Sequence, residues 1–266
     1  MTSLRKTHKN IIFAIAAAAA FLPALANATI VEIETNLGTF QVNLYDTDTP
    51  DTVANFLAYV QDGDYSDSVI HRSVAGFIVQ GGGLLTDGNA TLAEITARAP
   101  VQNEPVFANV RGTISMAKLA SGPNTATSQW FFNLSDNTAN LDNQNGGFTV
   151  FGQVIDDGMT VVDAIAAVPT FNNVFGLNDF PLQNYTPGNP LINDNLVIVT
   201  SITVIDTTVD SAAALNKPLT TRDDSGGNNG GGTNLGGGGG GGSFALLSLF
   251  SLLLLGRRRY RLAKAT

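Results

Sequence analysis

The chain has 266 residues, enough for one large domain or two small ones. It contains no cysteine and only two histidines, His8 and His71, which excludes disulfides, thiol catalysis and zinc–thiolate sites. Its formal net charge of −8 argues against broad nucleic-acid binding, so no nucleic-acid partner is expected.

The first 28 residues have the pattern of a secretory signal peptide. Basic residues within 5–9 precede an apolar run over 11–22, and Ala26-Asn27-Ala28 supplies the small-x-small pattern of a cleavage site. The alternative is a retained anchor helix, which the short apolar run disfavours. Cleavage would remove His8 and leave one histidine, so no multi-histidine metal site is expected.

Residues 29–206 are expected to form one β-rich domain. Phe40, Val42 and Leu44 alternate with polar residues, which is the period of a half-buried strand. Similar short runs recur along the chain between Gly- and Asn-containing turns. The strands are predicted over 30–35, 39–45, 69–71, 77–80, 113–117, 129–133, 149–154 and 195–206.

Two helices are predicted within this domain. Thr49 is a favourable N-cap, Pro50 fits the first helical position, and Gly63 ends the first helix. The second helix is expected over 157–168, while 169–193 has no clear period and is predicted to be a long loop. Many short strands with two helices suggest a closed antiparallel barrel with helical caps; a β-sandwich is the alternative.

The C-terminal region changes composition abruptly. Twelve of the 28 glycines lie between Gly226 and Gly242, so residues 207–243 are predicted to be a flexible linker. Residues 244–255 form a short apolar helix in this interpretation, and the arginines within 256–266 act as a cytoplasmic stop. With the uncharged residues before it, this helix reaches about 30 Å, just enough to cross a bilayer.

This order of glycines, short apolar helix and arginines resembles the GlyGly-CTERM sorting tails of Gram-negative bacteria. The resemblance implies a rhomboid-type protease as a partner that cuts near the glycines, and transfer to the cell surface. The alternative is a permanent single-pass anchor. In both cases the membrane contact is made by the C-terminal tail alone.

The standard catalytic and metal-binding patterns are absent from the sequence. It contains no Gly-x-Ser-x-Gly, no HExxH, no P-loop and no EF-hand loop. Most carboxylates stand in Asp-, Asn- and Gly-rich turns, where they cap backbone groups. Hydrolytic chemistry, metal chemistry and a cofactor are therefore not expected.

Three segments carry a family resemblance. Residues 70–82 (IHRSVAGFIVQGG), 112–117 (GTISMA) and 128–133 (SQWFFN) resemble the signature segments of cyclophilin-type peptidyl-prolyl cis-trans isomerases. Further matches occur over 50–65 and 148–152 and at Leu141-Asp142. The resemblance implies a mainly β fold, a closed eight-stranded antiparallel barrel capped by two α-helices, and proline-containing polypeptides as substrates.

The reaction of that family suits a site without cysteine, metal or cofactor. Uncatalysed rotation about an X-Pro bond takes ~10–100 s because amide resonance opposes it. No covalent bond breaks, so a catalyst needs an apolar slot for proline, a grip on the peptide backbone and a hydrogen-bond donor aimed at the prolyl nitrogen. Arginine suits the last task because it is permanently charged and carries a rigid fork of donors.

The resemblance assigns roles to individual residues. Arg72 would be the donor, and Gln80 would hold the substrate carbonyl or position Arg72. His71 would either support the rim of the slot or serve as a structural hydrogen-bonding residue. The walls of the slot would be Phe77, Ile78, Phe131 and Leu141, with Gln129 and Phe148 beside them and the backbone of Ala117 and Lys118 gripping the peptide as an added strand.

Strand alternation supports part of this assignment. Gln129 and Phe131 share one face, whereas Trp130 and Phe132 point the other way, into packing. Ile78 and Gln80 also share a face. The alternation does not place Phe77, whose assignment follows from the resemblance alone.

The sequence departs from the family pattern at several positions. Asn140 stands where many members have an aromatic residue that eukaryotic members use in binding cyclosporin, so cyclosporin sensitivity is predicted to be weak. Phe148 replaces the usual histidine, and Ile78 replaces a more common methionine. Two additional residues within 118–122 and the long segment 169–193 are expected to alter which peptides fit.

The sequence therefore predicts an exported isomerase that assists folding in the periplasm or at the cell surface of a Gram-negative bacterium. One alternative is a non-catalytic peptide-binding or chaperone module that retains the groove. The other is a surface adhesion protein in which the tail is the functional part.

Overall fold

The computed structural model describes residues 29–208 and 211–222. The predicted signal peptide, the glycine-rich part of the linker, the apolar segment 244–255 and the basic tail lie outside these residues. Within the described ranges, no helix is both long and apolar enough to cross a bilayer.

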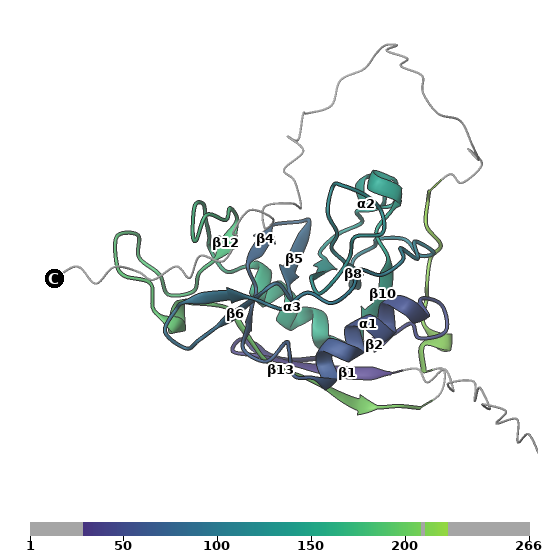
Figure 1. The fold of residues 1–266 in the computed structure, drawn as a ribbon, viewed down its shortest axis with the longest axis horizontal. Coiled ribbons are helices and arrows are strands. Elements are labelled where there is room, and N and C mark those ends of the chain that lie inside the picture. Colours follow the sequence, from purple (N-terminus) through teal and green to yellow (C-terminus); the bar gives the residue numbers. More distant parts are fainter. Residues whose placement is uncertain (1–28, 209–210, 223–266) are drawn as a thin grey trace, which may run out of the picture.

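The described chain is dominated by short antiparallel strands, which Figure 1 shows. They are β1 (Ile30–Thr35), β2 (Gly38–Leu44), β3 (Ser68–Val69), β4 (Arg72–Val74), β5 (Ile78–Gly81), β6 (Leu84–Thr86), β7 (Leu92–Glu94), β8 (Thr113–Met116), β9 (Trp130–Asn133), β10 (Val150–Val154), β11 (Thr170–Phe171), β12 (Phe180–Pro181) and β13 (Ile198–Asp206). In the described part of the chain, eleven of them form one sheet in the order β4-β5-β9-β8-β10-β2-β1-β13-β3-β6-β7, and β11 pairs with β12.

The sheet is strongly curled into a half-barrel. Only Ile70 and His71 separate β3 from β4, yet β4 is an edge strand and β3 lies near the opposite edge of the hydrogen-bonded order. At this bend, the Ile70 N–H donates to the Val197 carbonyl and the His71 N–H donates to the Gln80 carbonyl. One covalent segment thus draws the two ends of the sheet together.

This topology confirms a mainly β fold but does not confirm a closed barrel of eight strands. In the described residues the sheet has two edge strands, β4 and β7. Of the strand predicted over 69–71, only Val69 lies in a strand, as the last residue of β3, whereas Ile70 and His71 form the bend before β4 begins at Arg72. Such bends divide the chain into more and shorter strands than hydrophobic alternation indicates.

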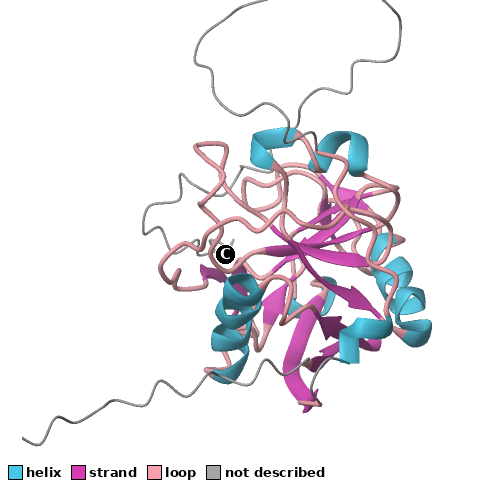
Figure 2. Ribbon diagram, turned by 90° about the vertical axis from the view of Figure 1, so that its right-hand side faces the viewer, coloured by secondary structure: helices cyan, strands magenta, loops and turns pink. Residues whose placement is uncertain are grey.

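The helices lie at the periphery of the molecule (Figure 2). The α-helices are α1 (Pro50–Gln61), α2 (Thr138–Leu141) and α3 (Met159–Ala166), and the 3-10 helices are η1 (Gln144–Gly146), η2 (Asp156–Gly158), η3 (Asn193–Asn195) and η4 (Ser211–Ala214). Both predicted helices are confirmed as α1 and α3, although α3 is shorter than expected. Helix α2 was not predicted.

The N-terminus of α1 is capped differently from the prediction. Pro50 is the first helical residue, but the side chain of Thr49 makes no capping hydrogen bond. Instead, the distant Glu104 carboxylate accepts hydrogen bonds from the Thr52 N–H at 2.9 Å and the Thr52 hydroxyl at 2.6 Å. A negative group at a helix N-terminus is stabilised by the unpaired N–H groups there.

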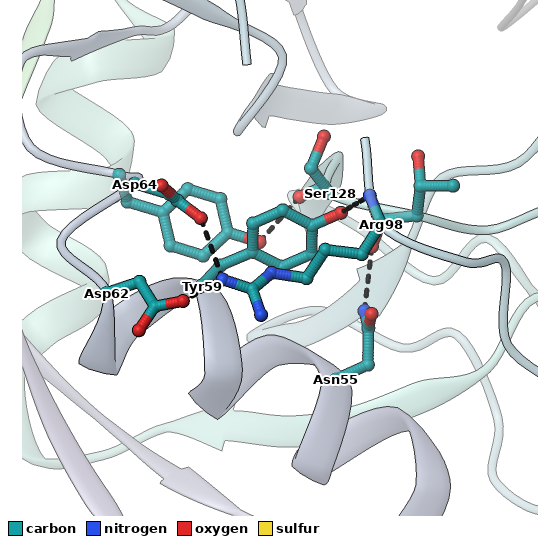
Figure 3. A network of polar contacts seen from close by, with 8 residues as sticks. Asn55, Tyr59, Asp62, Asp64, Arg98 and Ser128 are labelled. Carbon is teal, nitrogen blue, oxygen red and sulfur yellow. Dashed lines mark hydrogen bonds and ion pairs between the residues drawn. The ribbon is translucent and has the colours of Figure 1, made fainter. Parts of the chain in front are cut away.

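The C-terminal end of α1 is fixed by an arginine. The Arg98 guanidinium lies 4.7 Å from the Tyr59 ring centroid and pairs with Asp62 and Asp64 (Figure 3). The Arg98 N–H also donates to the Tyr59 hydroxyl at 2.7 Å. These contacts tie the loop around residue 98 to the helix.

The main hydrophobic core fills the inside of the curled sheet. Helix α1 adds Val53, Phe56 and Tyr59, and α3 adds Val162 and Ile165. The sheet supplies Val31, Ile33, Phe40, Val42, Leu44, Val79, Ile114, Met116, Trp130, Phe132, Phe151, Val154, Val199 and Ile202.

The segment 169–193 builds a smaller cluster of its own. Leu177, Phe180 and Leu182 from this segment are buried against Val69 of β3 and Ile198 of β13. The predicted loop therefore carries β11, β12 and a local core, which fixes it against the sheet.

Part of the predicted linker also packs on the domain. Of residues 207–243, the stretches 207–208 and 211–222 are described, and the second stretch runs beside residues 106–108. The Ala108 N–H donates to the Pro218 carbonyl, and the Thr220 N–H donates to the Val106 carbonyl, both at 2.9 Å. The packed domain thus continues to residue 222.

Candidate functional site

The strand register places the predicted polar and aromatic residues in one row. Arg72 of β4 is paired with Gln80 of β5, Gln80 with Phe131 of β9, and Phe131 with Ser115 of β8. Because side chains alternate between the two faces of a strand, all four lie on the same face of the sheet. Trp130 and Phe132 belong to the core on the other face, which confirms the alternation read from the sequence.

An apolar cluster adjoins this row. Its edge-to-face pair, Phe131 and Phe148, has ring centroids 5.8 Å apart, and Phe77 packs against it as a half-buried residue. The buried members are Ile78, Ala117, Phe131, Leu141 and Phe148. The structure thus brings together the apolar residues that the resemblance assigned to the slot, although they are far apart in sequence.

Phe77 reaches the cluster from a turn and not from a strand. Strand β5 begins at Ile78, and Gly76 has a φ of 68° in the turn before it, a conformation that glycine adopts without steric cost. The Phe77 carbonyl accepts from the Leu134 N–H and the Asn137 side-chain amide, both at 2.9 Å. This explains why strand alternation could not place Phe77.

The Nε edge of the Arg72 guanidinium group faces a carboxylate. Its Nε lies 3.7 Å from Oδ2 of Asp179, and 13% of its side chain is exposed. Its Nη1 is buried and finds no hydrogen-bond partner among the described residues. Burial lowers the pKa of Arg72 and Asp179 opposes that shift, but arginine remains charged in proteins.

Gln80 and Gln129 are connected to each other. The Gln80 side-chain amide donates to Oε1 of Gln129 at 2.8 Å. Oε1 of Gln80 is buried and, like Nη1 of Arg72, has no hydrogen-bond partner in the described ranges. A buried donor and a buried acceptor on cross-strand neighbours are therefore both free, which is rare in folded proteins.

His71 lies in the interior beside this pair. It is only 3% exposed, and its side chain shares a hydrogen bond with that of Gln129. Burial, with a smaller effect of the Arg72 charge, lowers the pKa of His71 to about 4. A neutral, buried imidazole fits the structural reading of this residue.

Lys118 supports the apolar cluster through its side chain. It is 4% exposed, its Nζ lies 4.8 Å from the Phe148 ring centroid, and the ammonium donates to the Asn145 and Gly147 carbonyls. Burial, followed by the charge of Arg222, lowers its pKa to about 8. The Ala117 N–H already donates to the Gln129 carbonyl, so this amide is occupied within the sheet.

A buried polar network that the sequence analysis did not identify lies behind Leu141 and Phe148. Asp142 Oδ1 accepts from the Asn109 N–H at 2.9 Å and from its side-chain amide at 3.0 Å. That amide also donates to the Phe148 carbonyl at 3.2 Å, while Asp142 Oδ2 accepts from the Thr221 N–H at 2.8 Å. The Leu-Asp pair was noted only as a motif; the polar partners are far away in sequence.

Helix α1 and Tyr65, which follows it, fix the chain immediately before β9. Asn55 donates to the Thr127 carbonyl and the Tyr65 hydroxyl donates to the Ser128 carbonyl, both at 2.7 Å (Figure 3). These bonds hold the backbone that leads into Gln129. Among the described residues, no group of three or more His, Cys, Asp or Glu side chains gathers as a candidate metal site.

The chain matches a known protein family. Residues 30–186 match the model of the family described as cyclophilin type peptidyl-prolyl cis-trans isomerase/CLD. A peptidyl-prolyl cis-trans isomerase of Acinetobacter baylyi is 44% identical over 150 residues, covering 55% of this chain and 76% of that protein. Peptidyl-prolyl cis-trans isomerase A of Dickeya dadantii is 39% identical over 186 residues, covering 68% and 90%.

A solved structure agrees with this assignment. The crystal structure of a cyclophilin type peptidyl-prolyl cis-trans isomerase from Cryptosporidium parvum has a TM-score of 0.50 and 26% sequence identity, covering 67% of this chain and 98% of that chain. The chain therefore belongs to the cyclophilin-type peptidyl-prolyl cis-trans isomerase family and is an isomerase of class EC 5.2.1.8.

Proposed function

We propose that Arg72 is the hydrogen-bond donor for rotation of the X-Pro bond. The observation that carries this proposal is the buried, unpartnered Nη1 of Arg72 beside the equally unpartnered Oε1 of Gln80, counted over the described residues. Both belong to the row that contains Phe131. A donor, an acceptor and an apolar cluster are the elements that a proline-containing peptide requires.

The chemistry follows from this placement. When the X-Pro bond twists, the nitrogen lone pair leaves conjugation and becomes a better acceptor, so a donor held by Arg72 binds the twisted state more tightly than the planar one. Gln80 would accept from or position the peptide backbone. Losing one such preorganised donor typically reduces kcat by ~10²–10³-fold in enzymes.

The proposed substrates are proline-containing polypeptides. Phe131, Phe148 and Leu141 would contact the proline ring, with Phe77 at the partly open side of the cluster. Ile78 and Gln129 would complete the site, and backbone groups near Ala117 and Lys118 would contact the extended peptide.

The decisive measurement is proline-peptide isomerisation by full-length Arg72→Ala. We expect kcat/KM to fall at least ~100-fold while thermal unfolding stays within a few degrees of wild type. Arg111→Ala is the matched control, because Arg111 also pairs with an aspartate, Asp163, and both side chains are about half exposed. Wild-type activity in Arg72→Ala would contradict the proposed role, and peptide binding without rate enhancement by wild type would indicate a non-catalytic module.

We further propose that the enzyme is exported and assists the folding of exported proteins. The support is the signal-like pattern over residues 1–28 and the Gly-rich, apolar and Arg-rich order at the C-terminus. Membrane contact would be made by that tail, with a rhomboid-type protease as its processing partner. Mass spectrometry of both termini of the protein from cell-envelope and cytoplasmic fractions tests this; an intact N-terminus in the cytoplasm would contradict it.

A further inference from the structure

The segment 169–193 brings a carboxylate to Arg72. Asp179 precedes Phe180, which is completely buried in the local cluster of this segment. The Ser73 N–H donates to the Asp179 carbonyl at 2.8 Å, and the Asp179 N–H donates to Oδ1 of Asn172 at 3.1 Å. Backbone bonds on both sides and a buried neighbour therefore fix the position of this acid next to β4.

The backbone of Asp179 is itself in a restricted conformation. Its φ of 55° lies in the left-handed region, which Asp and Asn tolerate better than most residues. This geometry directs the residue toward the start of β4, where Oδ2 lies 3.7 Å from Nε of Arg72. The backbone of the turn thus sets the position of the Asp179 carboxylate.

We propose that Asp179 is a positioning residue that holds the Nε edge of Arg72, so that the Nη1 edge stays directed at the substrate; this inference rests on the proposed catalytic role of Arg72. A guanidinium is planar and rigid, so fixing one edge also fixes the direction of the others. Only 13% of the Arg72 side chain and 30% of the Asp179 side chain are exposed, so the two charges lie largely out of solvent. The effect of the Arg72–Asp179 pair is to orient the guanidinium group.

Asp179→Asn tests the inference in the full-length chain. Asparagine retains the size of the side chain and tolerates a positive φ, so the turn is preserved while the charge is lost. We expect kcat to fall about three- to tenfold with little change in KM, because orientation of the donor affects the transition state more than peptide binding. Asp194→Asn, an exposed acid shortly after the same segment, is the charge-matched control and should match wild type.

A second readout separates positioning from a general effect on the loop. In nitrogen-15 spectra of the guanidinium groups, the Arg72 Nε–Hε resonance, assigned by its loss in Arg72→Lys, should shift in Asp179→Asn and stay in place in Asp194→Asn. Unchanged kcat in Asp179→Asn with an active wild type would overturn this inference alone. Absence of isomerase activity in wild type would overturn the proposed function and this inference with it.

Discussion

The two faces of the strands β5, β9 and β8 perform different tasks with neighbouring residues. On the inner face, Trp130 and Phe132 join the large core, where their rings lie 5.4 Å apart. On the outer face, Phe131 belongs to a small cluster beside Gln80 and Arg72. Buried polar atoms without a hydrogen-bond partner among the described residues occur on both faces: Gln80 Oε1 and Arg72 Nη1 on the outer face, and Trp130 Nε1 on the inner face. Strand alternation thus places a run of three aromatic residues in two different apolar clusters.

The outer face is supported differently from the inner face. The inner face is enclosed by α1, α3 and the curl of the sheet. The outer cluster depends on loops and side chains from distant segments, among them Lys118, Asp142, Asp179 and the stretch 211–222. Substitutions should therefore separate into losses of stability on one face and losses of activity on the other.

The largest effect is expected from truncating an inner-face ring. Phe132→Ala should lower the free energy of unfolding by ~3–5 kcal/mol, because it removes a buried ring from the main core and leaves a cavity. Phe131→Ala should destabilise less and reduce kcat/KM more. Urea unfolding and peptide isomerisation of both variants measure this. A larger loss of stability in Phe131→Ala than in Phe132→Ala would contradict this division of tasks between the two faces of the sheet.

A smaller loss of stability is expected at low pH from His71, which lies at the bend between β3 and β4. Its folded pKa of about 4 lies below the unfolded value of about 6.5, so the unfolded state binds the proton first as pH falls. Stability should therefore be lost between pH 6.5 and about 4, by up to ~3 kcal/mol.

The reference for this prediction is His71→Gln, which lacks the titrating group. Its stability should depend less steeply on pH over the same range, since carboxylates contribute equally to both proteins. Identical pH profiles in urea unfolding would show that His71 is not held neutral by the fold.

The smallest loss of stability is expected from a substitution in the stretch 211–222. Thr221 donates from its N–H and its hydroxyl to Oδ2 of Asp142, next to Leu141 of the outer cluster. Thr221→Val keeps the shape and removes the hydroxyl bond, which should cost about 0.5–1.5 kcal/mol. Thr203→Val, at an exposed position of β13, is the control and should be neutral in thermal unfolding. Equal melting temperatures of the two variants would place Thr221 outside the support of the site.

Local patterns predicted the parts of the fold that depend on neighbours in sequence. Pro50 marks the start of α1, and the alternation around Phe131 correctly separates the residues of the main core from those on the other face of the sheet. The same patterns missed the split between β3 and β4, because a bend at Ile70 leaves the hydrophobic run unbroken. They also missed the capping of α1 by Glu104, since that contact joins residues far apart in the chain.

For the site, the resemblance to a known family indicated which residues belong together, and the structure places Arg72, Gln80 and Phe131 on the adjacent strands β4, β5 and β9. The sequence did not indicate which contacts hold the site residues in place. The Arg72–Asp179 pair, the bonds of Lys118 and the packing of 211–222 depend on where loops return to the sheet.

The sequence alone was sufficient for the alternation of the strands and the start of α1, because both follow from spacing along the chain, and its resemblance to a known family indicated the signature residues of an isomerase. Only the tertiary structure decided that the sheet curls at residues 70 and 71, that Phe77 enters the cluster from a turn and that Asp179 meets Arg72. Those contacts depend on the path of long segments, and their free energies are realised only once the main core has fixed the sheet beneath them.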